Sequence, residues 1–189
     1  HSGGRTLDFL PFAAAHALPD EEQEAAGFAA VAAFGAPWSM RMREIDAAGM
    51  LDTAAETMGK VFVTTELGGG GTARAETVAI ARRGVRDLLR HAGILAGAVE
   101  PRPTRWLEMP SDDCFTFAPR AGLCEPMADL GAEVAKGALI ARIHDFERTG
   151  AQPVEISAPM AGLLAARHFP GLIQTGDCAA VVAVPMEAP

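Results

Sequence analysis

The side chain best placed to do chemistry in this chain is Glu66, because it follows a β-type run and precedes a run of glycines. Residues Val61 to Thr65 are β-branched or aromatic, which predicts a buried strand of an α/β sheet. Sites in such sheets lie beyond the carboxyl ends of strands, and burying a carboxylate is costly unless it is paired or functional. Glu66 is therefore a candidate general base that activates water. The alternative is a glutamate that only caps the following helix or pairs with an arginine.

The glycines Gly68–Gly71 predict a turn whose backbone can approach a ligand closely. Gly68 and Gly69 are therefore candidate substrate-binding residues that present a backbone N–H. A phosphate-binding loop is a second interpretation of such glycines. We set it aside because the Gly-Lys-Ser/Thr ending, which supplies a positive charge and a magnesium ligand, is missing from the sequence.

His1 is the second candidate, since its small neighbours Ser2, Gly3 and Gly4 make it a poor core residue. An imidazole in such a place can bind zinc or transfer protons. The alternative is a remnant of an expression tag or a frayed terminus. The sequence opens on this histidine and not on a methionine, so we expect the chain to be the C-terminal part of a larger catalytic unit.

The first half of the chain contains the elements that must hold these residues. Residues 7–18 predict a strand or extended segment that leads away from His1. Acidic residues at 20–22 start a helix that ends at Gly35, because acids in a first turn interact favourably with the helix dipole. Further helices are predicted over 46–58 and 73–95, the latter with an apolar face and a solvated face of arginines.

The sequence changes character near Pro103, where helices give way to short β-type runs separated by glycine turns. Strands are predicted over 114–118, 137–144, 153–156, 162–166 and 179–184. Repeated phrases such as Ala158-Pro-Met-Ala-Gly162 resemble lipoyl- and biotinyl-type barrel-sandwich domains. A prosthetic-group carrier presents a lysine at a hairpin tip, whereas the tip expected at 144–152 contains none. We therefore predict an all-β barrel-sandwich domain that is not a carrier.

Composition excludes several classes of partner. The chain has 189 residues and a net charge of −8, with no block of Lys and Arg. Nucleic acids and anionic membranes need a basic surface, so neither is an expected partner. No apolar run is long enough to span a membrane. The cysteines Cys114, Cys124 and Cys178 form no Cys-x-x-Cys pair and are interpreted as reduced, structural thiols of a cytoplasmic protein.

Two phrases, His1-Ser2 and Thr65-Glu66-Leu67, together resemble the zinc carboxypeptidases. The longer phrases over residues 1–12 and 64–72 are similar to the succinylglutamate desuccinylase/aspartoacylase branch, and within it most similar to deacetylases of N-acetyl-2,4-diaminobutyrate. The resemblance implies that His1 is a Zn2+ ligand and that Glu66 is the catalytic carboxylate. It also implies a C-terminal β-domain, in agreement with the β-type runs.

The chain departs from this family at the metal site. The family takes its other two zinc ligands from an upstream His-x-x-Glu, and no such motif precedes His1 here. We expect those ligands in residues outside this numbering. The His-x-x-Glu that the chain does contain, His144 to Glu147, lies in the predicted β-domain and is not expected to bind zinc. The arginines that bind the substrate carboxylate in the family also fall mostly upstream, which leaves Arg5 as the candidate in this chain.

These observations predict a zinc-dependent amidohydrolase that removes an acyl group from a small N-acyl amino acid. Zinc, held by His1 and two upstream ligands, would activate water and polarise the amide carbonyl. Glu66 would accept the proton of the water and pass it to the leaving amine. The predicted fold is α/β: the C-terminal part of a zinc-carboxypeptidase-like mixed sheet with helices over 1–103, followed by the barrel-sandwich domain over 104–189.

Two other functions stay open at this point. The nearer is a zinc carboxypeptidase that acts on peptides, although a β-domain that closes the cleft favours small ligands. The other is a non-catalytic binding module whose β-domain is a partner surface, and it predicts no bound zinc. The sequence leaves open the acyl group, the amino acid and whether the chain forms a homo-oligomer.

Overall fold

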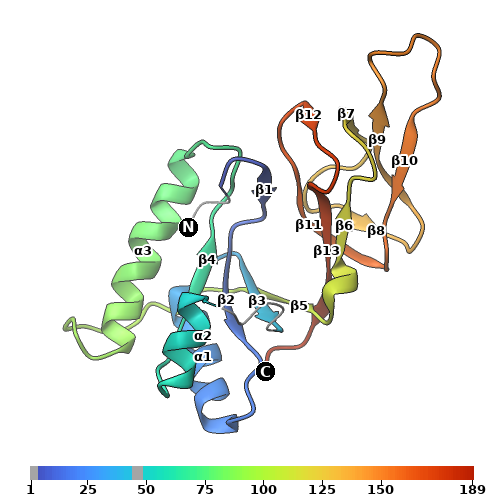
Figure 1. The fold of residues 1–189 in the computed structure, drawn as a ribbon. Coiled ribbons are helices and arrows are strands. Elements are labelled where there is room, and N and C mark those ends of the chain that lie inside the picture. The colour runs from blue at the N-terminus through green and yellow to red at the C-terminus, as the bar shows by residue number, and fades with distance from the viewer. Residues whose placement is uncertain (1–3, 44–48) are drawn as a thin grey trace.

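The computed structural model describes residues 4–43 and 49–189 (Figure 1). Among these residues, a mixed sheet of nine strands forms the larger part of the fold, and three α-helices gather beside one end of it. A separate sheet of four strands lies at the other end. In the part of the chain that is described, no helix is both long and apolar enough to cross a membrane.

The first half of the chain alternates strands and helices. The elements are β1 (Leu7–Phe9), β2 (Phe12–His16), α1 (Glu21–Phe34), β3 (Trp38–Met42), α2 (Leu51–Thr57), β4 (Thr64–Glu66) and α3 (Ala75–His91). The Asp20 carboxylate caps α1 by accepting hydrogen bonds from the N–H groups of Glu22 and Gln23 at 3.0 and 2.9 Å. Gly35 ends the helix in the left-handed region, at φ +66°. Both ends of α1 confirm the prediction from sequence.

The second half is built from short strands. They are β5 (Arg105–Met109), β6 (Phe115–Phe117), β7 (Gly122–Pro126), β8 (Glu133–Val134), β9 (Leu139–His144), β10 (Val154–Ser157), β11 (Gly162–His168), β12 (Leu172–Ile173) and β13 (Cys178–Met186). The five β-type runs predicted from the sequence fall on β6, β9, β10, β11 and β13, which confirms that they are strands. Strands β10, β9, β7 and β12 form the smaller sheet, in that order.

The larger sheet joins the two halves of the chain. Its order is β1-β11-β13-β5-β3-β2-β4, with β6 paired to β13 and β8 paired to β11. Strands β2, β3 and β5 are parallel neighbours. Strand β13 pairs with β11 through residues 180–183 and with β5 through residues 184–186. The sheet is therefore continuous across Pro103, and the division into a catalytic part and a barrel-sandwich domain stays a prediction.

Helix α3 buries a face that the sequence does not indicate. The buried positions are Thr77, Ile80, Gly84 and Asp87. A Cβ atom at Gly84 would lie 2.4 Å from the Phe34 ring, so this glycine lets α3 pack closely on α1. The expected apolar face is largely exposed, and its members Val78, Val85 and Leu89 are 40%, 52% and 37% accessible.

An ion-pair cluster explains which face of α3 turns inward. The buried Asp87 carboxylate is 2.6 Å from a guanidinium nitrogen of Arg102 and 3.0 Å from one of Arg90. Arg102 lies in the segment that follows α3, where the chain returns to the sheet before β5. Because a buried carboxylate must be paired, Asp87 fixes this face of the helix toward Arg102.

The strand before Glu66 is shorter than predicted and is not buried. Only residues 64–66 form β4, and Val61 is 50% exposed. β4 lies at the edge of the sheet and runs antiparallel to β2. The prediction of a buried strand from Val61 to Thr65 is therefore wrong, although Glu66 does end a strand.

Candidate active site

Glu66 ends β4 at the point where β2 begins. Its backbone is in register with Phe12, the first residue of β2. Because β4 is antiparallel to β2, Glu66 lies at the amino ends of the parallel strands and not at their carboxyl ends. The rule that sites follow the carboxyl ends of parallel strands therefore does not explain its position. Glu66 is a half-buried residue at the end of a strand, directly before the glycine turn.

The glycine turn packs against the first residues that the structure describes. The Phe9 N–H donates to the Gly68 carbonyl at 3.3 Å, and the Gly70 N–H donates to the Leu7 carbonyl at 3.1 Å. The Gly71 N–H donates to the Gly4 carbonyl at 2.8 Å. Residues 4–9 and 66–71, which are far apart in the sequence, therefore form one unit.

Packing alone requires glycine in this turn. A Cβ atom at Gly69 would lie 1.9 Å from the Leu7 carbonyl oxygen, and one at Gly70 would lie 2.6 Å from the Phe169 ring. The Phe169 N–H in turn donates to the Thr6 carbonyl at 2.8 Å. Gly68 adopts φ +96°, a backbone conformation that favours glycine. The roles of Gly68 and Gly69 in substrate binding stay predictions beside this structural one.

The structure places one of the two remaining predicted site residues near this turn. Arg5 is exposed, and its Cγ atom lies 4.0 Å from the position that a Cβ atom would take at Gly71. His1 lies outside the described residues, so its assignment as a zinc ligand stays a prediction.

Two further polar residues beside the turn, Asp8 and Arg74, were not predicted from the sequence. Asp8 is 3% exposed in β1, and its Oδ2 atom accepts a hydrogen bond from Nη2 of Arg74 at 2.8 Å. The other oxygen, Oδ1, lies 3.8 Å from the position of a Cβ atom at Gly68. The signal that could have revealed Asp8 is a lone acid inside the apolar run over 7–18.

The described residues do not by themselves fit a zinc ion. They contain no group of three or more His, Cys, Asp or Glu side chains that could hold a metal. In the His-x-x-Glu segment of the β-rich half, His144 Nε2 is 2.8 Å from Glu125 Oε2. The Glu147 N–H donates to the Asp145 carboxylate at 3.1 Å. This segment therefore forms local pairs.

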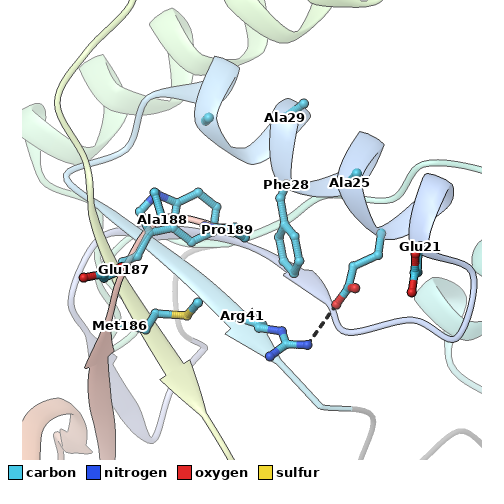
Figure 2. A pocket seen from close by; sticks show the side chains of 12 residues that line it. Glu21, Ala25, Phe28, Ala29, Arg41, Met186, Glu187, Ala188 and Pro189 are labelled. Carbon is cyan, nitrogen blue, oxygen red and sulfur yellow. Dashed lines mark hydrogen bonds and ion pairs between the residues drawn. The ribbon is translucent and has the colours of Figure 1, made fainter.

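A hollow of about 680 Å³, which Glu66 does not line, lies between α1 and the sheet (Figure 2). Its largest apolar lining residues are Phe28, Trp106 and Met186, and Arg41 is its cation. Arg41 is paired with Glu24 at 3.1 Å and with Glu108 at 3.3 Å. Because two carboxylates neutralise this arginine, we assign no anionic ligand to the hollow.

The cysteines are free thiols, as the sequence analysis expects. Burial raises the pKa of Cys178 to about 11 and also raises the pKa values of Cys114 and Cys124. A thiol of raised pKa forms little thiolate near neutral pH and is a poor nucleophile. None of the three is therefore a candidate for the chemistry of this site.

Comparison with known proteins finds a family model and a relative that are similar to this chain. Residues 1–92 match the model of the succinylglutamate desuccinylase/aspartoacylase catalytic domain. Over 190 residues the chain is 45% identical to the N-alpha-acetyl-L-2,4-diaminobutyric acid deacetylase of Halomonas elongata. That match covers 100% of this chain and 56% of the relative, so the chain spans about half the length of the relative.

Solved structures extend the similarity over nearly the whole chain. The product-bound ectoine utilization protein EutE (DoeB) of Ruegeria pomeroyi has a TM-score of 0.93 and 59% identity, covering 97% of this chain and 56% of that one. A succinylglutamate desuccinylase from a Silicibacter species has a TM-score of 0.93 and 54% identity, covering 98% of this chain and 56% of that one. The first half of the chain therefore matches the catalytic-domain model of the succinylglutamate desuccinylase/aspartoacylase family, and nearly the whole chain is similar to proteins of this kind.

Proposed function

We propose that this chain is part of a zinc-dependent deacylase that removes the acyl group from a small N-acyl amino acid. The observation that carries the proposal is the packing of the glycine turn against residues 4–9, which joins the two motifs of the family around Glu66. N-acetyl-2,4-diaminobutyrate is the first candidate substrate. The 45% identity to a deacetylase named for this compound supports the choice.

Glu66 is the general base of the proposed reaction. Its carboxylate accepts a proton from the attacking water and later gives it to the nitrogen of the leaving amino acid, so that one group serves both steps. The backbone on either side of Glu66 is held firmly, because Phe12 pairs with it and the turn is tied to β1. A base on a rigid support keeps the orientation that proton transfer needs.

Zinc is the proposed cofactor, and the resemblance of His1-Ser2 to the ligand segment of the family supports it. Bound zinc would supply an activated water and polarise the amide carbonyl. His1 is the ligand that this chain offers, and the other two are expected outside this numbering.

The remaining parts of the proposal concern location and partners. We place the protein in the cytoplasm, where free thiols such as the three cysteines persist. The proposed partner is a small N-acyl amino acid, and neither a nucleic acid nor a membrane is part of the proposal. Gly68, Gly69 and Arg5 are proposed to contact the substrate.

The test is amine release from N-acetyl-2,4-diaminobutyrate by the full-length protein, with zinc or with a chelator. Glu66→Gln should lower kcat by about 10²-fold or more, the contribution of a general base, while bound zinc is retained. Glu76→Gln is the matched control, because Glu76 is an exposed acid in the first turn of α3. This control should leave the rate unchanged.

Three results would contradict the proposal in different ways. If Glu66→Gln kept more than about a tenth of the wild-type rate, Glu66 would not be the base. If the wild-type protein bound zinc but released no amine, the acyl amino acid would be wrong. If it neither bound zinc nor released amine, a non-catalytic binding module would be the better description.

A further inference from the structure

Asp8 and Arg74 form an ion pair in which the anion is buried and the cation is exposed. The Asp8 side chain is 4% exposed, whereas the Arg74 side chain is 54% exposed. Only Oδ2 of Asp8 is bonded to Arg74, and Oδ1 is buried with no hydrogen-bond partner among the residues that the structure describes. A buried carboxylate with one unpaired oxygen is costly, and an exposed partner repays little of that cost. The stability that the ion pair contributes therefore does not by itself explain why a carboxylate is buried at this position.

The pair lies directly beside the turn that follows the proposed base. Asp8 Oδ1 is 3.8 Å from the position that a Cβ atom would take at Gly68, two residues after Glu66. The Phe9 N–H, next to Asp8 in the chain, donates to the Gly68 carbonyl at 3.3 Å. A side chain at Gly68 would point at the Asp8 carboxylate, so the turn and the pair share one region of the molecule.

The backbone of Arg74 is fixed in addition to its side chain. The Thr77 hydroxyl donates to the Arg74 carbonyl at 3.1 Å and accepts a bond from the Arg74 N–H at 3.4 Å. Arg74 directly precedes α3, so it lies at the positive end of a helix of 17 residues. A guanidinium group has five N–H donors, and the bond to Asp8 uses one of them. The other donors are held in place and are partly open to solvent.

We propose that Arg74, oriented by Asp8, acts in addition to Arg5 and binds the carboxylate of the N-acyl amino acid whose hydrolysis is proposed above. A carboxylate is the ligand that a planar guanidinium fork recognises best, and the positive end of α3 adds to the attraction. Asp8 is then a positioning residue, because it acts through Arg74 and not on the substrate. The proposal rests on the proposed function for the identity of the ligand, and on the Asp8–Arg74 geometry for the residue that binds it.

The competing explanation is that the pair only fastens the start of α3 to β1. The two explanations differ in what they predict for a substrate that lacks the negative charge. A binding role makes Arg74 matter for a carboxylate and not for the corresponding neutral carboxamide. A fastening role changes stability and affects both substrates alike.

The experiment compares N-acetyl-2,4-diaminobutyrate with its carboxamide in the full-length protein loaded with zinc. Arg74→Ala should raise KM for the carboxylate by about 10- to 100-fold, the effect of losing a charge-assisted hydrogen bond, with a small change in kcat. The carboxamide should change less than about threefold. Asp8→Asn should shift KM in the same direction but by less, because Arg74 remains while its anchor weakens. Arg83→Ala is the matched control, since Arg83 is an exposed arginine of the same helix.

Stability is measured in parallel, and Arg74→Lys replaces Arg74→Ala if the alanine variant does not fold. Arg74→Lys keeps the charge but loses the planar fork, so it should recover part of the carboxylate preference. If the wild type hydrolyses the carboxylate and Arg74→Ala keeps its preference over the carboxamide, the role of Arg74 is refuted while the proposed function stands. If the wild type hydrolyses neither compound, N-acetyl-2,4-diaminobutyrate is not the substrate, and the role of Arg74 in binding its carboxylate is refuted with it.

Discussion

Replacing Gly69 with alanine tests whether the glycine turn is clamped against β1. Gly69 is not in the left-handed region, so the added methyl group causes no backbone strain of its own. The new Cβ atom would lie 1.9 Å from the Leu7 carbonyl oxygen, whereas real Cβ contacts stay above 3.0 Å. The turn and β1 must therefore separate by about 1.1 Å, the difference between these distances. Both neighbours in the collision are backbone, so no flexible side chain can move aside.

This separation predicts a measurable loss of stability. Overpacking costs about 1–3 kcal/mol, and lengthening the Gly70–Leu7 and Phe9–Gly68 hydrogen bonds adds about 1 kcal/mol. We therefore expect the free energy of unfolding to fall by about 3 kcal/mol, which corresponds to a Tm lower by about 6–12 °C for a chain of this size. Because the turn follows Glu66 directly, a shift of about 1 Å should also lower kcat/KM by about 10²-fold.

Thermal unfolding and amine release by the full-length protein measure both effects. Gly171→Ala is the control, because a Cβ atom there meets only Leu123 Cδ1 at 3.7 Å, an ordinary contact. Its Tm and its kcat/KM should stay close to the wild-type values. If Gly69→Ala kept its Tm within about 1 °C of wild type and its kcat/KM within about threefold, the turn would not be clamped against β1 as described.

Two further predictions concern titratable groups. Hydrogen bonds from Arg102, then Arg90, hold the pKa of Asp87 below its usual value of 3.8 despite burial, so its stabilising effect is complete above that pH and is lost as the pH falls through the lowered pKa. Asp87→Asn should therefore lower the free energy of unfolding by about 3 kcal/mol at neutral pH, and urea unfolding should show the two proteins converging below about pH 4. Because burial raises the pKa of Cys178 to about 11 and also that of Cys114, a thiol reagent at about pH 8 should label both slowly in the folded protein and rapidly in urea. Rapid labelling of the folded protein would contradict their burial.

The parts of the fold that could be predicted from sequence are those with local signals. Helix α1 has an acid at its N-cap and a glycine at its C-cap, and both act within a few residues. The β-type runs of the second half likewise carry their pattern and their turns within themselves. Strand β3 was not predicted, because Trp-Ser-Met-Arg-Met is short and carries Arg41, whose charge is neutralised by residues distant in sequence.

In the candidate site, too, only the residues with local sequence signals could be predicted. Glu66 and the glycine turn form one continuous phrase, so they could be found from the sequence. Asp8 and Arg74 are 66 residues apart, and neither has a neighbour in the sequence that indicates the other. The prediction of the inward face of α3 was wrong for a related reason. Asp87 turns inward because it pairs with Arg102, which lies beyond the end of the helix. Long-range ion pairs determine these positions, and the spacing of apolar residues along the sequence does not indicate such pairs.

Residues beyond Pro103 also belong to the support of the site. Strand β1, which carries Asp8, is only three residues long and pairs with β11, where Asp8 is in register with Arg167. Directly after β11, Phe169 packs against Gly70 and bonds to the Thr6 carbonyl. The turn beside Glu66 is thus held both by β1 and by a residue of the second half. A short strand has few contacts of its own, so the position of the Asp8–Arg74 pair depends on β11, wherever the boundary between the two domains lies.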